Sequence, residues 1–145
     1  MRRFCAFGMI VLVLISTIAA PASACSCLRP PEAPVALAGS TAVFLGKVTA
    51  IERGKTGLQI TIEVDRAWKG IATKTVSLNT APDDGMCGYH FEIGKSYLVY
   101  ANGDKPKEGE QPKLSTNICT RTCHIDQAGD DLKAIGEGKK IADAK

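Results

Sequence analysis

The pair Cys25-Ser26-Cys27 has the most unusual chemistry in this sequence, because it directly follows a predicted export cleavage site. Small residues at Ala22 and Ala24 are typical of signal peptidase cleavage sites. Cleavage after Ala24 would leave Cys25 as the first residue, with a free α-amino group, a carbonyl oxygen and a sulfur atom at one chain end. The function therefore depends on whether this terminus is a working surface or a disulfide anchor.

The first 24 residues are typical of a secretory signal peptide, with Arg2 and Arg3 before the apolar run 4–20. This run is shorter than a comfortable membrane span. We therefore expect residues 1–24 to be removed and the protein to be secreted or periplasmic. A lipid anchor at Cys25, at the cell envelope, is the alternative, although the residue three positions upstream is Ala22 and not the usual leucine. Only in that case do we expect contact with a membrane.

Five cysteines follow residue 24. If two disulfides form among them, one thiol remains free. An exported protein meets an oxidising compartment, which favours disulfides. Bonds from the N-terminal pair to Cys87 and Cys119 would each close a long loop, worth about 4 kcal/mol by the chain-entropy estimate. The spacing alone does not choose among the pairings. The cysteines concerned are Cys25, Cys27, Cys87, Cys119 and Cys123.

The charge of the chain argues against binding to nucleic acid. The whole sequence carries a net charge of +3 at pH 7, of which Arg2 and Arg3 supply two. No basic stripe follows, and Lys139-Lys140 is interpreted as part of a solvated tail.

Alternating apolar and polar residues over 58–65 give the clearest structural signal. Leu58, Ile60, Ile62 and Val64 recur with a period of two, which is typical of a strand with one buried face. Gly46, inside an earlier apolar run, predicts a bulge or a close backbone approach. Strands are expected at 43–51, 58–65, 73–80, 97–101 and 114–117.

Two short helical elements complete the predicted fold. A helical turn is expected within 30–39, and a C-terminal helix is expected to be capped by Asp126 and to end at Gly136. Five strands with short turns predict a mainly β domain, a five-stranded OB-type Greek-key barrel, over residues 25–138. Residues 139–145 are expected to be a frayed tail.

Other combinations of reactive residues offer alternative sites. The cysteines with His90 and His124 could bind zinc, but C-x-C is not the usual spacing and oxidation competes. His90 is better interpreted as a packed side chain. The run Cys119 to His124 is one residue longer than a haem attachment motif. No hydrolase motif stands out. We therefore expect no cofactor and no enzyme activity.

Several short motifs, taken in order, resemble the N-terminal, netrin-like domain of tissue inhibitors of metalloproteinases, in the short single-domain form seen in bacteria. The resemblance covers most of 25–135. Its motifs are Cys25-Ser26-Cys27, Pro30-Pro31, Val43–Val48, Trp68-Lys69-Gly70, Cys87-Gly88-Tyr89, Gly94–Tyr100 and Thr116–Cys119.

The resemblance implies a function and a site. It implies that Cys25 is bridged to Cys87 and Cys27 to Cys119, and that the chain inhibits zinc metalloproteases of the metzincin type. The α-amino nitrogen and carbonyl oxygen of Cys25 would chelate the zinc of the protease. Ser26 would enter the pocket beyond the metal and Leu28 would line the cleft. The alternative is a non-inhibitory netrin-like binding module.

The sequence also departs from the family pattern. No cysteine lies in the 30–40 stretch to form the additional disulfide of the animal inhibitors, and Leu28-Arg29 separates the second cysteine from the first proline. Cys123 has no counterpart in the family. We expect a monomer unless Cys123 links two copies.

Overall fold

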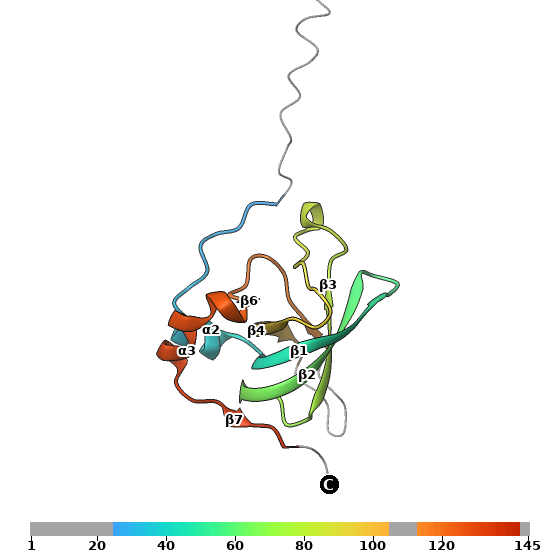
Figure 1. The fold of residues 1–145 in the computed structure, drawn as a ribbon. Coiled ribbons are helices and arrows are strands. Elements are labelled where there is room, and N and C mark those ends of the chain that lie inside the picture. Colours follow the sequence, from blue (N-terminus) through green and yellow to red (C-terminus); the bar gives the residue numbers. More distant parts are fainter. Residues whose placement is uncertain (1–24, 105–112, 143–145) are drawn as a thin grey trace, which may run out of the picture.

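A computed structural model describes residues 25–104 and 113–142, so the predicted signal peptide at 1–24 lies outside the described residues. Within these ranges no helix is long and apolar enough to cross a membrane. The fold is mainly β, with strands curling into a barrel and two short helices beside it (Figure 1). This is the fold class that the sequence predicts.

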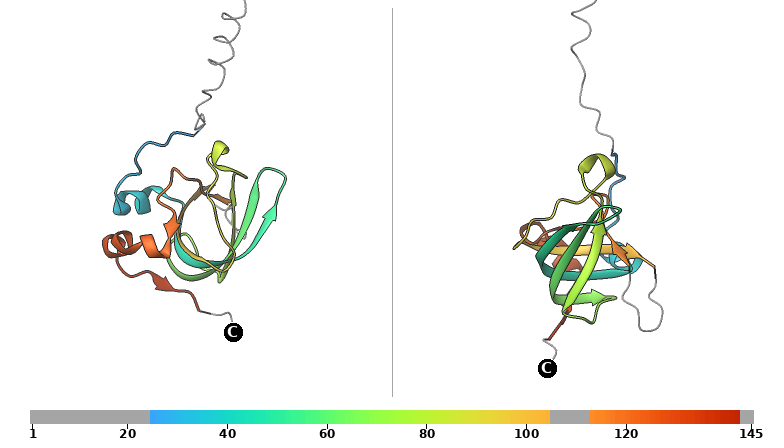
Figure 2. Two further views of the ribbon diagram at one scale, coloured as in Figure 1. Left: turned by 45° about the horizontal axis from the view of Figure 1, so that its top comes forward. Right: turned by 90° about the vertical axis from the view of Figure 1, so that its right-hand side faces the viewer.

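Five strands close the barrel in the order β1-β2-β3-β5-β4, and β1 pairs with β4 to complete it. All neighbouring pairs are antiparallel except β3 and β5, which run parallel. Figure 2 shows the closed barrel from two further sides. The strands are β1 (Ala42–Arg53), β2 (Leu58–Lys69), β3 (Thr75–Thr80), β4 (Ser96–Gly103) and β5 (Leu114–Ser115).

Gly46 marks an irregular point in the pairing of β1 with β2, as predicted. The register shifts between Leu45 and Gly46. A Cβ atom at Gly46 would lie 2.5 Å from Cγ2 of Ile62 and 2.6 Å from the carbonyl oxygen of Glu63. Since real Cβ atoms do not approach neighbours so closely, glycine allows the two strands to meet here.

The barrel interior is filled by apolar side chains that alternate along the strands. In β2 and β3, buried and exposed residues alternate, as the period of two in the sequence predicts. A second, smaller cluster lies between the barrel and the helices and includes Val43, Leu98, Tyr100 and Ala128. None of the bridged cysteines belongs to either cluster.

Two short helices lie side by side against the barrel: α2 (Ala33–Gly39) and α3 (Gly129–Ile135) (Figures 1 and 2). Lys69 in β2 donates hydrogen bonds from Nζ to the carbonyl oxygens of Leu37 and Ala38 at the end of α2. The helix α3 ends at Gly136, which has a φ of 71°, as the sequence predicts.

Two predictions about the C-terminal region are wrong. Asp126 does not cap α3; it lies in the separate 3-10 turn η2 (Ile125–Gln127), and α3 begins after Ala128. Residues 139–141 are not frayed, because β7 (Lys139–Lys140) pairs with β2 and Ile141 is buried in the core. The ordered domain therefore extends beyond 138, and 143–145 lie outside the described residues.

Candidate functional site

The N-terminal segment, residues 25–32, has neither helix nor strand and lies along the outside of the barrel before it enters α2 (Figure 1). Two disulfides hold its beginning. Cys25 is bonded to Cys87, with Cα atoms 5.5 Å apart, and Cys27 is bonded to Cys119, with Cα atoms 5.1 Å apart. These are the two bonds that the resemblance implies. The segment is therefore attached to two loops that lie far away in the sequence.

Cys87 lies at the end of the 3-10 turn η1 (Asp84–Met86), in a loop held by its own hydrogen bonds. The carboxylate of Asp83 accepts a hydrogen bond from the backbone N–H of Met86 at 3.0 Å. The N–H of Cys87 donates to the carbonyl oxygen of Asp84 at 3.1 Å. Cys87 itself has a φ of 60°, a left-handed conformation that is uncommon outside glycine. The Sγ atom that receives Cys25 is thus presented by a well-defined turn.

Cys119 lies in a second loop, and this loop is joined to the first. The backbone N–H of Cys119 donates to Oδ1 of Asn117 at 2.9 Å. The N–H of Ile118 donates to the carbonyl oxygen of Cys87 at 3.1 Å. Because this bond links the two receiving loops, both disulfides attach the N-terminal segment to one unit.

Several exposed side chains are sequence neighbours of the disulfide-bonded cysteines. Ser26 and Leu28 are exposed, and Leu28 is the extreme case at 92 %. Met86 and Ile118 are 63 % and 38 % exposed, and each is next to a bridged cysteine. We call Ser26, Leu28, Met86 and Ile118 the disulfide edge. Exposed apolar side chains that cluster together commonly form a binding surface.

Sequence reasoning identified Ser26 and Leu28 but missed Met86 and Ile118. A usable signal was their position directly beside Cys87 and Cys119. That signal only acquires meaning once the disulfide pairing is known, since Met86 is more than fifty residues from Leu28 in the chain.

The sulfur atoms of Cys25, Cys27 and Cys119 lie within 4.8 Å of one another. All three are in disulfides, and a bonded sulfur is not the thiolate that binds zinc. His90 was expected to pack inside the protein, but it is exposed in a coil. His124 lies 3.2 Å from a carboxylate oxygen of Asp126.

The C-x-x-x-C-H stretch forms two different structures. Cys119 is in a disulfide, whereas Cys123 and His124 form the short strand β6 (Cys123–His124), paired with β4. Cys123 is a free thiol, half-buried beside the second cluster. Burial, with a smaller effect of Asp131, raises its pKa to about 11. Cys119 therefore belongs to a loop, whereas Cys123 and His124 belong to a short strand added to β4.

The fold and the disulfide-bonded N-terminal segment together define a class of protein. It is a small OB-type barrel whose first described residues are attached by two disulfides to neighbouring loops. No protein-family model matches the sequence. A curated relative, the tissue inhibitor of metalloproteinase from Drosophila melanogaster, is 32 % identical over 124 residues, which cover 78 % of this chain and 53 % of the relative. The chain thus spans about half the length of that relative. It contains a netrin-like domain of the kind found in tissue inhibitors of metalloproteinases.

Proposed function

We propose that this protein is a secreted inhibitor of zinc metalloproteases and acts through its N-terminal segment. The observation that carries the proposal is the double attachment of the segment at Cys25 and Cys27, which leaves Ser26 and Leu28 exposed. Similarity to an inhibitor of metalloproteinases supports the class of partner. The protein acts by occupying an active site and carries out no reaction.

The chemistry of Cys25 suits a zinc ion in a partner. A catalytic zinc has three protein ligands and one position held by water. After cleavage at Ala24, the α-amino nitrogen and the carbonyl oxygen of Cys25 are two donor atoms in one residue, able to replace that water. An α-amino group has a pKa of about 7.7 to 8.0, so its deprotonation at the metal costs little free energy near neutral pH.

The disulfides contribute by ordering the segment before it binds. A flexible chain end loses conformational entropy when it enters an active site, and that loss reduces the affinity. Here the two disulfides attach the segment to two loops that are joined to each other, and this removes most of the conformational freedom of the segment before it binds. In the proposed complex Ser26 enters the pocket beyond the zinc and Leu28 lies in the cleft, with Met86 and Ile118 at its rim. We propose a metzincin-type protease as the partner and a monomer as the active form.

A single added residue tests the mechanism. We expect protein that starts at Cys25 to inhibit a metzincin-type protease, and protein with one alanine before Cys25 to lose inhibition, because the donor nitrogen becomes a peptide nitrogen. A matched control adds one alanine after Lys145. Melting temperatures and disulfide maps should agree among the three proteins. Equal inhibition by all three would refute zinc binding by the terminus.

The alternative function, a lipid-anchored module that inhibits nothing, is separable by mass spectrometry. A thioether to lipid at Cys25 uses the sulfur that the Cys25–Cys87 bond requires. Exported protein with an acylated first residue would favour the anchored module; an unmodified amine with an intact bond to Cys87 would favour the inhibitor.

A further inference from the structure

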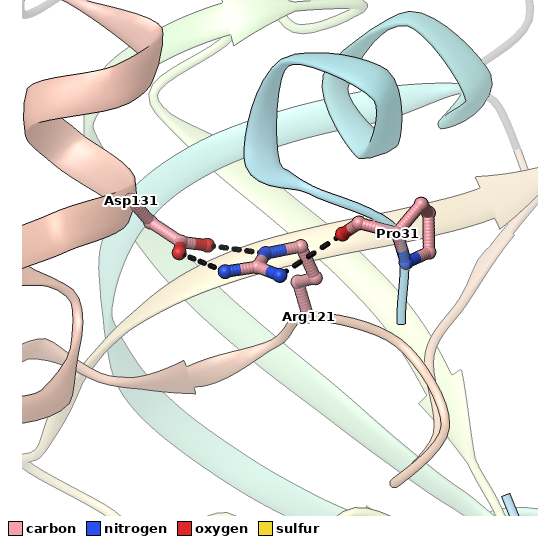
Figure 3. Close-up of polar contacts among 3 residues, drawn as sticks. All are labelled: Pro31, Arg121 and Asp131. Atoms are coloured by element: carbon pink, nitrogen blue, oxygen red, sulfur yellow. Dashed lines mark hydrogen bonds and ion pairs between the residues drawn. The ribbon is translucent and has the colours of Figure 1, made fainter. Parts of the chain in front are cut away.

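Arg121 connects the N-terminal segment to the C-terminal helix (Figure 3). Its Nη1 atom donates a hydrogen bond to the carbonyl oxygen of Pro31 at 2.9 Å. Its Nε atom donates to Oδ2 of Asp131 at 2.9 Å, and its Nη2 atom donates to Oδ1 of the same carboxylate. Asp131 belongs to α3, so one guanidinium group joins two parts of the chain that flank the barrel.

The pairing of Arg121 with Asp131 fixes the plane of the guanidinium group. Two parallel hydrogen bonds to one carboxylate give a bidentate pair, which is stronger and more directional than a single contact. The side chain of Asp131 is 9 % exposed and that of Arg121 is 24 % exposed, so water competes weakly for these atoms. Because the donors of arginine are coplanar, the remaining Nη1 donor can then point only in a narrow range of directions. In this structure it points at Pro31.

This contact is a third point of attachment for the N-terminal segment. The disulfides hold Cys25 and Cys27, and Arg121 holds Pro31 four residues further on. Leu28 and Arg29 therefore lie between two fixed points, and both are exposed. Pro30 and Pro31 stiffen the same stretch, since each ring fixes φ near −65°. Without the contact at Pro31, the next fixed point after Cys27 would be Ala33, which is buried at the start of α2.

We propose that Arg121 and Asp131 are positioning residues for inhibition, because their contact with Pro31 orients Leu28 for entry into the partner's cleft. This inference rests on the proposed function. It gives α3 a role in binding although α3 itself contributes no residue to the disulfide edge.

The test compares three variants of the mature protein. Arg121→Lys keeps the positive charge, but an ammonium group cannot hold the carboxylate at two points and aim a third donor at Pro31. Asp131→Asn keeps the shape of the side chain and removes the charge that aligns Arg121. Lys133→Ala is the matched control, because Lys133 lies on the same helix, is exposed, and pairs only loosely with Asp130 at 3.9 Å. Each protein is checked for both disulfides and for its melting temperature.

Two measurements separate positioning from a structural role. The first is the backbone order parameter of the Leu28 amide, obtained from nitrogen-15 relaxation of the free protein. We expect this order parameter to fall from about 0.85 to below about 0.6 in Arg121→Lys and in Asp131→Asn. The second is the inhibition constant, which we expect to rise about tenfold. A segment that is flexible before binding loses conformational entropy in the complex, and that loss weakens the affinity. Lys133→Ala should leave both values at those of the wild type.

The outcomes distinguish this inference from the proposed function. Wild-type protein that inhibits no metalloprotease removes the function, and the inference with it. Wild-type inhibition with an unchanged inhibition constant in the variants overturns the inference alone. An unchanged order parameter at Leu28, with both disulfides present, also overturns it, whatever the inhibition constants are.

Discussion

Gly88 lies directly against the carbonyl oxygen of Ala81: a Cβ atom built on Gly88 would be 2.2 Å from that oxygen. This close approach folds the chain back on itself beside Cys87, which is bonded to Cys25. The N–H of Gly88 also donates to the carbonyl oxygen of Asp83 at 2.9 Å. The geometry of the loop that receives the N-terminal residue therefore depends on the missing side chain at 88.

We predict that Gly88→Ala destabilises the protein and weakens inhibition. The added methyl group must displace the backbone of Ala81 or of the loop, at a cost of about 2 kcal/mol or more. Gly39→Ala is the control, because a Cβ there meets nothing within 4 Å and alanine is the better helix former. Urea unfolding of both variants measures the difference; equal free energies of unfolding would contradict the prediction.

We predict that Leu28→Ala weakens inhibition without changing stability. The side chain is 92 % exposed in the free protein, so its loss removes almost no buried surface from the fold. In a cleft the same side chain becomes buried, and truncation of an anchoring residue costs tenfold or more in affinity, about 1.4 kcal/mol. Val35→Ala, at an exposed apolar position on α2, is the control. Inhibition constants and melting temperatures of the two variants decide the matter.

We predict that the stabilisation supplied by Asp131 disappears in acid. Its hydrogen bonds from Arg121, with a smaller contribution from Tyr100, hold the pKa of the carboxyl below its usual range. A lowered pKa in the folded state means that the stabilisation is complete above the unfolded pKa of about 3.9 and is lost as the pH falls through the folded pKa. The unfolding free energies of wild type and Asp131→Asn should differ by about 2 kcal/mol at pH 6, and this difference should shrink as the pH falls below about 3.9. A constant difference over that range would contradict this.

We predict that Cys123 reacts slowly with iodoacetamide in the native protein. Its raised pKa, about 11, leaves very little thiolate at pH 8, whereas an unperturbed cysteine with a pKa near 8.5 is substantially ionised. Native protein should therefore be alkylated about 100-fold more slowly than urea-unfolded protein with its disulfides intact. Mass spectrometry of timed samples gives both rates. Equal rates would show that the thiol is in a different environment from the one described.

The four longer strands of the barrel, β1 to β4, were predictable because their signal is local. The alternation in β2 directly reflects which face of the strand is buried, and Gly46 signals the bulge from within one apolar run. In contrast, β6 and β7 are two residues long, too short for any periodicity, and their pairing depends on strands elsewhere in the chain. Lys139-Lys140 therefore looked like a solvated tail.

The site was predictable only in part, for the same reason. Cys25 and Cys27 stand out by their position after the predicted export signal. Their bonding partners could not be derived from spacing and were suggested by the resemblance alone. Arg121 gave no signal, because its partner Pro31 is 90 residues away in the chain, and an arginine near the C-terminus is ordinarily a solvated charge.

The four bonded cysteines are absent from both apolar clusters. The disulfides therefore hold the N-terminal segment in place but contribute no side chain to the core of the barrel. Reduction of the two disulfides would release the N-terminal segment and remove about 4 kcal/mol of stability per bond by the chain-entropy estimate, although it would take no side chain out of either cluster.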